Sequence, residues 1–204
     1  MPRTHNSSPF SPEILRTAYA HGFFPMPHPV TGQIHWFNPD PRAIIPLAAF
    51  HCSHSLHRSL RKKNFEITID KAFSEVMRGC ANRDETWITE DFINAYTELH
   101  HEGDAHSIEV WAGTSLVGGV YGISLGGAFF AESMFSKIRD ASKIALFHLV
   151  ERLKGQGFTL LEVQFLTPHL ASLGAVEISA EEYLVHLQNA LLLDQVFNNP
   201  PFNK

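Results

Sequence analysis

The sequence predicts a mixed α/β protein of the α+β class, with helices packed on a sheet built around an antiparallel meander. Residues 107–135 contain three strand-like runs separated by Ala-Gly-Thr and Leu-Gly-Gly turns. A helical pattern and then the strand-like run FTLLEVQF at 158–165 follow the meander. With 204 residues, of which 44% are hydrophobic and 18% charged, the chain can form one good core and a small annex.

The first 63 residues are expected to form a small N-terminal unit, and residues 64–204 the main domain. A Ser-Pro-Glu start at residues 11–13 predicts a short amphipathic helix. Six prolines between Phe24 and Pro46 predict an ordered loop rather than regular structure. The segment HSLHRSLRKK indicates a short helix with the densest basic patch, formed by Arg58, Arg61, Lys62 and Lys63. RNA contact and a solvated helix face are both open for this patch.

The main domain is predicted to follow a simple order of elements. These are a strand at 65–70, helices at 72–80 and after Thr89, the meander, a helix capped by Asp140, a strand at 158–165, and a last helix capped by Ser179. A meander, a helix and a further strand match the acetyltransferase-like fold, by analogy of pattern alone. Acyl-CoA users of that fold need a Gly-rich turn before the helix to hold a pyrophosphate. Here that place reads SKIRDASK, without glycine, so no CoA or other cofactor is expected.

Three polar residues interrupt strands that are otherwise apolar. A two-residue period puts Glu162 and Gln164 on one face of their strand, and Glu132 on a face with Phe130 and Met134. Burying a lone carboxylate costs several kcal/mol unless something pairs with it. A strand end that reaches solvent would explain the pair at 162 and 164 without function. Together with Glu132, the three residues indicate a cleft with an acidic floor, suited to a cationic ligand.

Several other function classes are disfavoured. His51, His54 and His57 are spaced three apart, but no Cys or carboxylate completes a tetrahedral set, so no metal site is expected. Neither SMFSK nor ASLGA forms the GxSxG elbow of a serine hydrolase. Isolated cysteines, an N-terminus without an apolar leader and the lack of a long apolar run predict a soluble, cytoplasmic protein without a membrane partner. A net charge of −5 disfavours a broad nucleic-acid-coating surface but leaves room for a local basic patch.

A series of long motifs runs through nearly the whole chain. They are GFFPM, WFNPDPRAIIP, TWIT, AYTELHHEGDAHSIEVW, LVGGVYG, FFAESMFS, DASK and QFLTPHLASLGAVEI. In this order they resemble the leucyl/phenylalanyl-tRNA–protein transferase family. The resemblance implies a cytoplasmic bacterial enzyme that moves Leu or Phe from aminoacyl-tRNA onto the N-terminal Lys or Arg of a protein, which marks that protein for degradation. It also implies an acetyltransferase-like catalytic domain without CoA. The N-terminal annex is expected to be a reduced version of that of the family, and the protein to be a monomer.

The same resemblance implies roles for individual residues. Gln164 matches the family glutamine that hydrogen-bonds the attacking α-amine, and Glu162 would orient its amide. Glu132 lies where the family recognises the basic side chain of the acceptor. The family positions for the donor pocket and donor cleft correspond to Phe129, Met134, Val120, Leu149, Trp87, Tyr96 and Tyr19. The tRNA body would be held through its phosphates by Arg58, Arg61, Lys62 and Lys63, with Lys137, Arg139 and Lys143 as further candidates.

Two positions depart from the family pattern. Glu162 stands where the family usually has Asp, and its extra methylene moves the carboxylate by more than a hydrogen bond tolerates. Met26 stands where many members have Trp, so stacking on adenine is weakened or replaced there. Two other functions stay open: a CoA-dependent N-acyltransferase of the same fold, and a non-catalytic module that binds basic N-termini. The missing glycine turn counts against the first, and the presence of Gln164 against the second.

Overall fold

The computed structural model describes residues 10–28, 31, 33–62, 65–83 and 86–197. A seven-stranded mixed sheet with the order β4-β5-β6-β7-β8-β3-β9 forms its centre, and β1 and β2 form a separate antiparallel pair. The strands are β1 (Phe24–Pro27), β2 (Ile34–Phe37), β3 (Arg42–Ile44), β4 (Glu66–Ile69), β5 (Ala105–Ala112), β6 (Ser115–Leu125), β7 (Ala128–Ser136), β8 (Leu160–Gln164) and β9 (Val176–Ile178). The helices are α1 (Pro12–Ala20), η1 (Leu47–Ala49, a 3₁₀ turn), α2 (His54–Arg61), α3 (Phe73–Ala81), α4 (Glu90–Glu102), α5 (Ala141–Gly155), α6 (Pro168–Ala171) and α7 (Ala180–Leu191).

The central meander is formed by β5, β6 and β7, which pair in antiparallel order as the sequence predicts. The chain then crosses over through α5, and β8 joins the sheet parallel to β7. Parallel strands need a crossover connection of about a dozen residues or more, which the segment containing α5 supplies. The predicted mixed α/β class is therefore confirmed.

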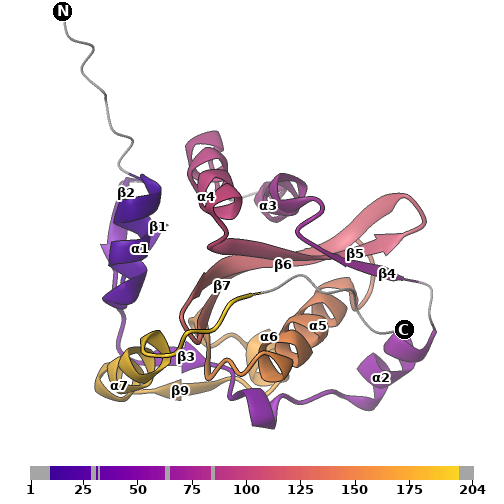
Figure 1. Cartoon of the computed structure of the whole chain (residues 1–204). Helices are drawn as coiled ribbons and strands as arrows, with labels where there is room; N and C mark the ends of the chain where they lie inside the picture. Colours follow the sequence, from indigo (N-terminus) through magenta and orange to yellow (C-terminus); the bar gives the residue numbers. More distant parts are fainter. Residues whose placement is uncertain (1–9, 29–30, 32, 63–64, 84–85, 198–204) are drawn as a thin grey trace, which may run out of the picture.

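Helices cover both faces of the sheet. In Figure 1, α3 and α4 lie over one face and α5 lies against the other. The first face carries a core that includes the rings of Tyr19, Tyr96 and Phe130. The second carries a core built on the buried side of α5, including Leu146 and Leu149. Because helices cover both faces of the sheet, a polar side chain buried in its middle loses contact with water and is costly unless a partner inside the protein replaces it.

The segment from Phe24 to Pro46 does not form the loop that its prolines predict. It contains β1, β2 and β3, and β3 lies inside the large sheet between β8 and β9. Pro25 and Pro27 are tolerated because β1 has a strand neighbour on one side alone, where a missing N–H costs little. In β3 the buried Ala43 and Ile44 supply the apolar contacts that stabilise a three-residue strand.

Three predicted helix caps are confirmed and one is wrong. The side chains of Ser11, Thr89 and Ser179 accept hydrogen bonds from the first turns of α1, α4 and α7. Asp140 occupies the N-cap position of α5 with a φ of 66°, but its side chain does not cap the helix. The Asp140 carboxylate instead accepts a hydrogen bond from Ser59 Oγ at 2.8 Å, which ties α2 to the start of α5.

None of the helices in the described residues combines the length and the apolar character that crossing a lipid bilayer requires.

Candidate active site

The site lies where two parallel strands separate. β7 and β8 pair from Ala128 and Leu160 as far as Phe130 and Glu162. A bulge in β7 follows at once: Tyr121 of β6 faces Ser133 while Gly122 faces Ala131, so Glu132 is the extra residue. Bulges re-aim side chains and interrupt pairing, and here the end of the paired stretch coincides with a cavity between the two strands.

Because of the bulge, one of the side chains predicted to share a face of β7 lies on the opposite face. Glu132 remains on the face of Phe130, as alternation predicts, and it interacts there with Tyr19 and Tyr96. Met134 does not share that face, because it packs with the core on the α5 side. One extra residue shifts the two-residue period, so a side chain beyond the bulge points to the opposite face.

A cavity of about 80 Å³ lies between β7, β8 and α5. Its lining residues are Val120, Ala131, Glu132, Ser133, Met134, Leu146, Val163, Gln164 and Leu170. Most of this wall is apolar, and Glu132 and Gln164 supply acceptor and donor groups. The cavity therefore combines a surface for an aliphatic or aromatic side chain with a polar centre.

The donor-pocket residues implied by the family resemblance divide into two groups. Val120 and Met134 line the cavity. Phe129 and Leu149 are at most 1% exposed and belong to the same core, but they are not lining residues. Sequence reasoning did not assign Leu146 to the pocket, although it lies one helical turn before Leu149 on the face predicted to be buried.

Gln164 connects the two carboxylates of the site. Its Nε2 donates to Glu132 Oε1 at 3.2 Å and to Glu162 Oε2 at 3.1 Å, and its backbone N–H donates to Glu162 Oε1 at 2.7 Å. The residue has a φ of 58°, which is uncommon for a side chain with a Cβ and is often found at functional sites. Because two acceptors face Nε2, the amide orientation is determined, and Oε1 remains available as an acceptor.

Arg42 at the start of β3 is a further site residue that sequence reasoning missed. Its Nε donates to Glu162 Oε1 at 2.8 Å, and both side chains are 0% exposed. Further donors of its guanidinium reach Gly22 O at 2.9 Å and Asn38 Oδ1 at 3.1 Å, and its Cζ lies 4.3 Å from the ring centroid of Tyr183. An arginine keeps its proton in proteins, so Glu162 serves as its buried counter-ion. The sequence feature that could have indicated Arg42 is its position in the motif WFNPDPRAIIP, directly before an apolar run.

Burial raises the pKa of both carboxyl groups. For Glu132 burial raises the pKa to about 8, although hydrogen bonding from Tyr19 and attraction to Arg42 act in the opposite direction. For Glu162 burial again raises the pKa, while the charge of Arg42 and the hydrogen bonds from Gln164 lower it. Since Arg42 pairs with Glu162, Glu132 is the carboxyl group that a cationic ligand would stabilise most.

Tyr19 and Tyr96 converge on Glu132. Their hydroxyl oxygens are 2.7 Å apart, both side chains are 0% exposed, and interaction with both hydroxyls lowers the pKa of the Glu132 carboxyl against the effect of burial. Trp87 lies farther out: it is half-buried and makes an edge contact with Phe92, with ring centroids 5.3 Å apart. Of the three aromatic residues that the resemblance implies for the donor cleft, Tyr19 and Tyr96 therefore lie beside Glu132.

The predicted basic patch lies on α2. Arg58, Arg61 and Lys62 are exposed, and within the described part of the chain none of them forms an ion pair. Lys63 lies outside the described residues. The Ser59–Asp140 hydrogen bond connects this helix to α5, the helix that contributes Leu146 to the cavity.

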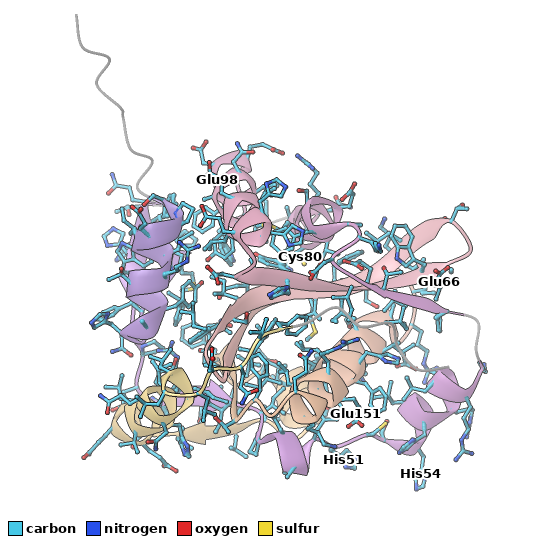
Figure 2. All side chains as sticks on the ribbon, in the orientation of Figure 1. His51, His54, Glu66, Cys80, Glu98 and Glu151 are labelled. Carbon is cyan, nitrogen blue, oxygen red and sulfur yellow. The ribbon has the colours of Figure 1, made fainter. Side chains whose placement is uncertain are left out.

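The histidines do not gather into a metal site in the part of the chain that the structure describes, where no cluster of three or more His, Cys, Asp or Glu could hold an ion. Figure 2 shows His51 and His54 near α2 with side chains directed outward, and both are exposed.

The sequence matches two family models. Residues 44–188 match "Leucyl/phenylalanyl-tRNA protein transferase", and residues 8–40 match the N-terminal domain of that family. A leucyl/phenylalanyl-tRNA–protein transferase of Herpetosiphon aurantiacus is 54% identical over 188 residues, covering 92% of this chain and 97% of the relative. One of Gloeobacter violaceus is 50% identical over 183 residues, covering 90% and 95%. Among solved structures, L-PGS from Bacillus licheniformis is 14% identical with a TM-score of 0.43, covering 78% of this chain and 55% of that one. A structural likeness this low supports no argument.

Proposed function

The chain belongs to the leucyl/phenylalanyl-tRNA protein transferase family, and we propose that it transfers leucine or phenylalanine from aminoacyl-tRNA to an N-terminal lysine or arginine of a protein. The reaction takes place in the cytoplasm, by a monomer, and marks the acceptor for degradation. The observation that carries the proposal is the Gln164 amide, held between two carboxylates beside an apolar cavity.

Glu132 recognises the basic side chain of the acceptor. Its carboxyl group is half-buried, lines the cavity, and has a pKa raised by burial. A lysine or arginine side chain would replace the lost solvation with a charge-assisted hydrogen bond and would lower that pKa. A neutral acceptor side chain offers no such gain, which accounts for selectivity towards basic N-termini.

Gln164 positions the α-amine for attack on the ester of the aminoacyl-tRNA. The amine nitrogen forms a bond to the ester carbonyl carbon, the bond from that carbon to the ribose oxygen breaks, and the proton lost by the amine ends on this oxygen, which leaves as the hydroxyl of the free tRNA. Because Gln cannot act as a strong base, its Oε1 serves to align the amine by accepting a hydrogen bond. Glu162, fixed by Arg42, holds the amide in this orientation. Alignment of an amine against an already activated ester supplies much of the rate.

The donor uses both the cavity and the surface around it. Val120, Met134 and Leu146 pack against the leucyl or phenylalanyl side chain, with Phe129 and Leu149 as the layer behind them. Tyr19 and Tyr96 position Glu132, and Trp87 offers a surface for the terminal adenine. The exposed cations of α2 bind tRNA phosphates, together with Lys63, which lies outside the described residues.

The separation of β7 and β8 around the cavity is the reason to assign this domain to the acetyltransferase-like architecture. A CoA-dependent reaction is disfavoured by the start of α5. There Ser136 Oγ already accepts the hydrogen bond of the Ser142 N–H, and the Asp140 carboxylate would repel a pyrophosphate.

The decisive experiment mixes the protein with labelled Leu-tRNA or Phe-tRNA and peptides that begin with Arg, Lys, Asp or Ala. We expect label to appear on the Arg and Lys peptides alone. Label transferred from acetyl-CoA but not from tRNA would identify a CoA-dependent acyltransferase. Binding of basic peptides without any transfer would identify a non-catalytic module.

A further inference from the structure

A second cavity borders the apolar one at Met134 of β7. It has a volume of about 360 Å³ and is lined by Gly79, Asn82, Arg83, Met134, Phe135, Ser136 and Lys137. Met134 lines both cavities. The described residues that form this wall include two cations and no carboxylate, so the cavity is suited to an anion.

Arg83 is held in place by neutral oxygen atoms. Its Nε donates to Cys80 O at 2.7 Å, and a terminal nitrogen donates to Ser133 Oγ at 2.9 Å. Figure 2 labels Cys80 beneath α3, at the side of the sheet where α3 packs. The bond to Cys80 O offsets the partial negative charge at the end of α3. Nevertheless, among the described residues no carboxylate neutralises Arg83, whereas Arg78 on the same helix pairs with Glu90.

Lys137 supplies the second cation. Its side chain is exposed, its Nζ lies 5.8 Å from the ring centroid of Phe135, and within the described chain it forms no ion pair. A guanidinium and an ammonium group in one cavity match the negative charge of a phosphate, and the terminal nitrogen of Arg83 that makes none of the bonds to Cys80, Ser133 and Met134 can donate to its oxygens. The exposed amide of Asn82 adds a neutral donor to the same wall.

We propose that Arg83 and Lys137 bind a backbone phosphate of the 3′-terminal nucleotides of the donor RNA. The inference rests on the proposed function and adds a phosphate site next to the reacting ester. A donor side chain in the apolar cavity places its ester near Glu132 and Gln164. The attached ribose and phosphate then continue across Met134, the residue shared by the two cavities, towards Arg83 and Lys137. An acidic peptide would also match the positive charge of the second cavity. Unlike the RNA, however, it is not covalently attached to the amino acid in the apolar cavity.

The first test compares two minimal donors in transfer to an Arg-initiated peptide: the phenylalanyl ester of adenosine and the phenylalanyl ester of the dinucleotide CpA, which adds one internucleotide phosphate. We expect the unsubstituted enzyme to use the CpA ester with roughly tenfold higher kcat/KM, as charge-assisted hydrogen bonds of this kind provide. Arg83→Gln and Lys137→Gln should each lose most of this preference. The matched controls Arg78→Gln, on the same helix, and Lys71→Gln should retain it.

The second test measures binding of the labelled trinucleotide CCA without any reaction. The logarithm of the binding constant falls as the logarithm of the salt concentration rises. This slope should become less steep by about 0.7 for each cation removed at this site and should be unchanged in the controls. If Arg83 only supports the backbone of β7, Arg83→Gln would impair both minimal donors equally and Lys137→Gln would impair neither, which would overturn the proposal. Equal use of both donors by the unsubstituted enzyme would also overturn it. An enzyme that is inactive even with intact charged tRNA would instead refute the proposed function, while the binding test still reports on the phosphate site.

Discussion

Two acidic residues in strands of the same sheet, Glu109 and Glu132, have different surroundings. Glu109 in β5 is 0% exposed, and its oxygens accept hydrogen bonds from Thr68, Ser107 and the Ala72 N–H. Glu132 in β7 also has a pKa raised by burial, but its carboxyl group lines a cavity. Glu109 is enclosed by partners from its own fold, whereas Glu132 has space beside it for a further partner.

The difference shows that burial alone does not identify a binding carboxylate. Both acids occupy strands of the meander, and both bear the desolvation that raises a carboxyl pKa. The distinguishing features of Glu132 are the bulge that places it, the separation of β7 from β8, and the coupling through Gln164 to an Arg-paired second carboxylate. Substitutions in the two centres should therefore have different consequences.

The largest effect should be on stability, when Glu162 is replaced. Glu162→Gln removes the counter-ion of the fully buried Arg42 and should lower the free energy of unfolding by about 3 to 5 kcal/mol. Glu109→Gln leaves no buried cation behind and should cost about 1 to 3 kcal/mol. Urea denaturation of both variants measures the difference. An equal loss in the two variants would contradict the view that Arg42 and Glu162 form a buried ion pair.

Gln164→Ala should have the largest effect on turnover with little effect on tRNA binding. Loss of the amide removes the hydrogen bonds to both carboxylates and the acceptor proposed for the α-amine, so kcat should fall about 100-fold. Glu109→Gln, tested at a temperature where it remains folded, should lower kcat by less than about threefold. If Gln164→Ala kept its full rate at saturating charged tRNA, the alignment role would be wrong.

The raised pKa of Glu132 should give this residue a contribution of its own to the pH dependence of stability. Its pKa rises on folding from 4.5 to about 8, so the folded state binds more protons than the unfolded state in this interval. Stability therefore falls as the pH rises through that window, by at most about 1.4 kcal/mol for each unit of pKa shift. Glu132→Gln should remove this contribution, so its stability relative to the unsubstituted protein should increase with pH. Parallel curves between pH 5 and 8 would show that the pKa is not raised.

The smallest effect on the folded protein should come from the exposed cations of α2. Reversing Arg61 and Lys62 to Glu should leave stability within about 0.5 kcal/mol, because neither residue is buried or paired in the described chain. The same change should weaken tRNA binding and flatten its dependence on salt, since fewer counter-ions are released. Use of an aminoacyl-adenosine donor should hardly change. An unchanged salt slope would make α2 a solvated helix face.

The elements that the sequence predicts correctly are those in which one spacing of apolar residues, that of a strand or of a helix, continues without interruption. The meander, α5 and β8 have clear patterns of alternation or helical spacing, and the caps at Ser11, Thr89 and Ser179 use local hydrogen bonds. β3 was missed because the prolines that flank it, Pro41 and Pro46, suggest a loop, whereas its partners β8 and β9 come more than 100 residues later. Pairing over such distances leaves no local signal.

The site was only partly predictable for the same reason. Glu132, Glu162 and Gln164 stood out because polar residues are rare in apolar strands. The bulge at Glu132 could not be predicted, since strict alternation assumes that no residue is inserted, and Met134 was therefore placed on the wrong face. Arg42 was missed because its partner Glu162 is 120 residues away.

The central claim is that Glu132 binds the positive charge of the acceptor, and a matched pair of variants tests it most directly. The measurement is the KM for an Arg-initiated peptide and for the same peptide beginning with the neutral citrulline, at saturating charged tRNA, in Glu132→Gln and Glu109→Gln. We expect Glu132→Gln to raise the KM for the Arg peptide at least tenfold and to remove most of the discrimination against citrulline, as loss of a desolvated charge pair requires. Glu109→Gln should keep the discrimination of the unsubstituted enzyme. Full discrimination in Glu132→Gln would show that the basic side chain is recognised elsewhere.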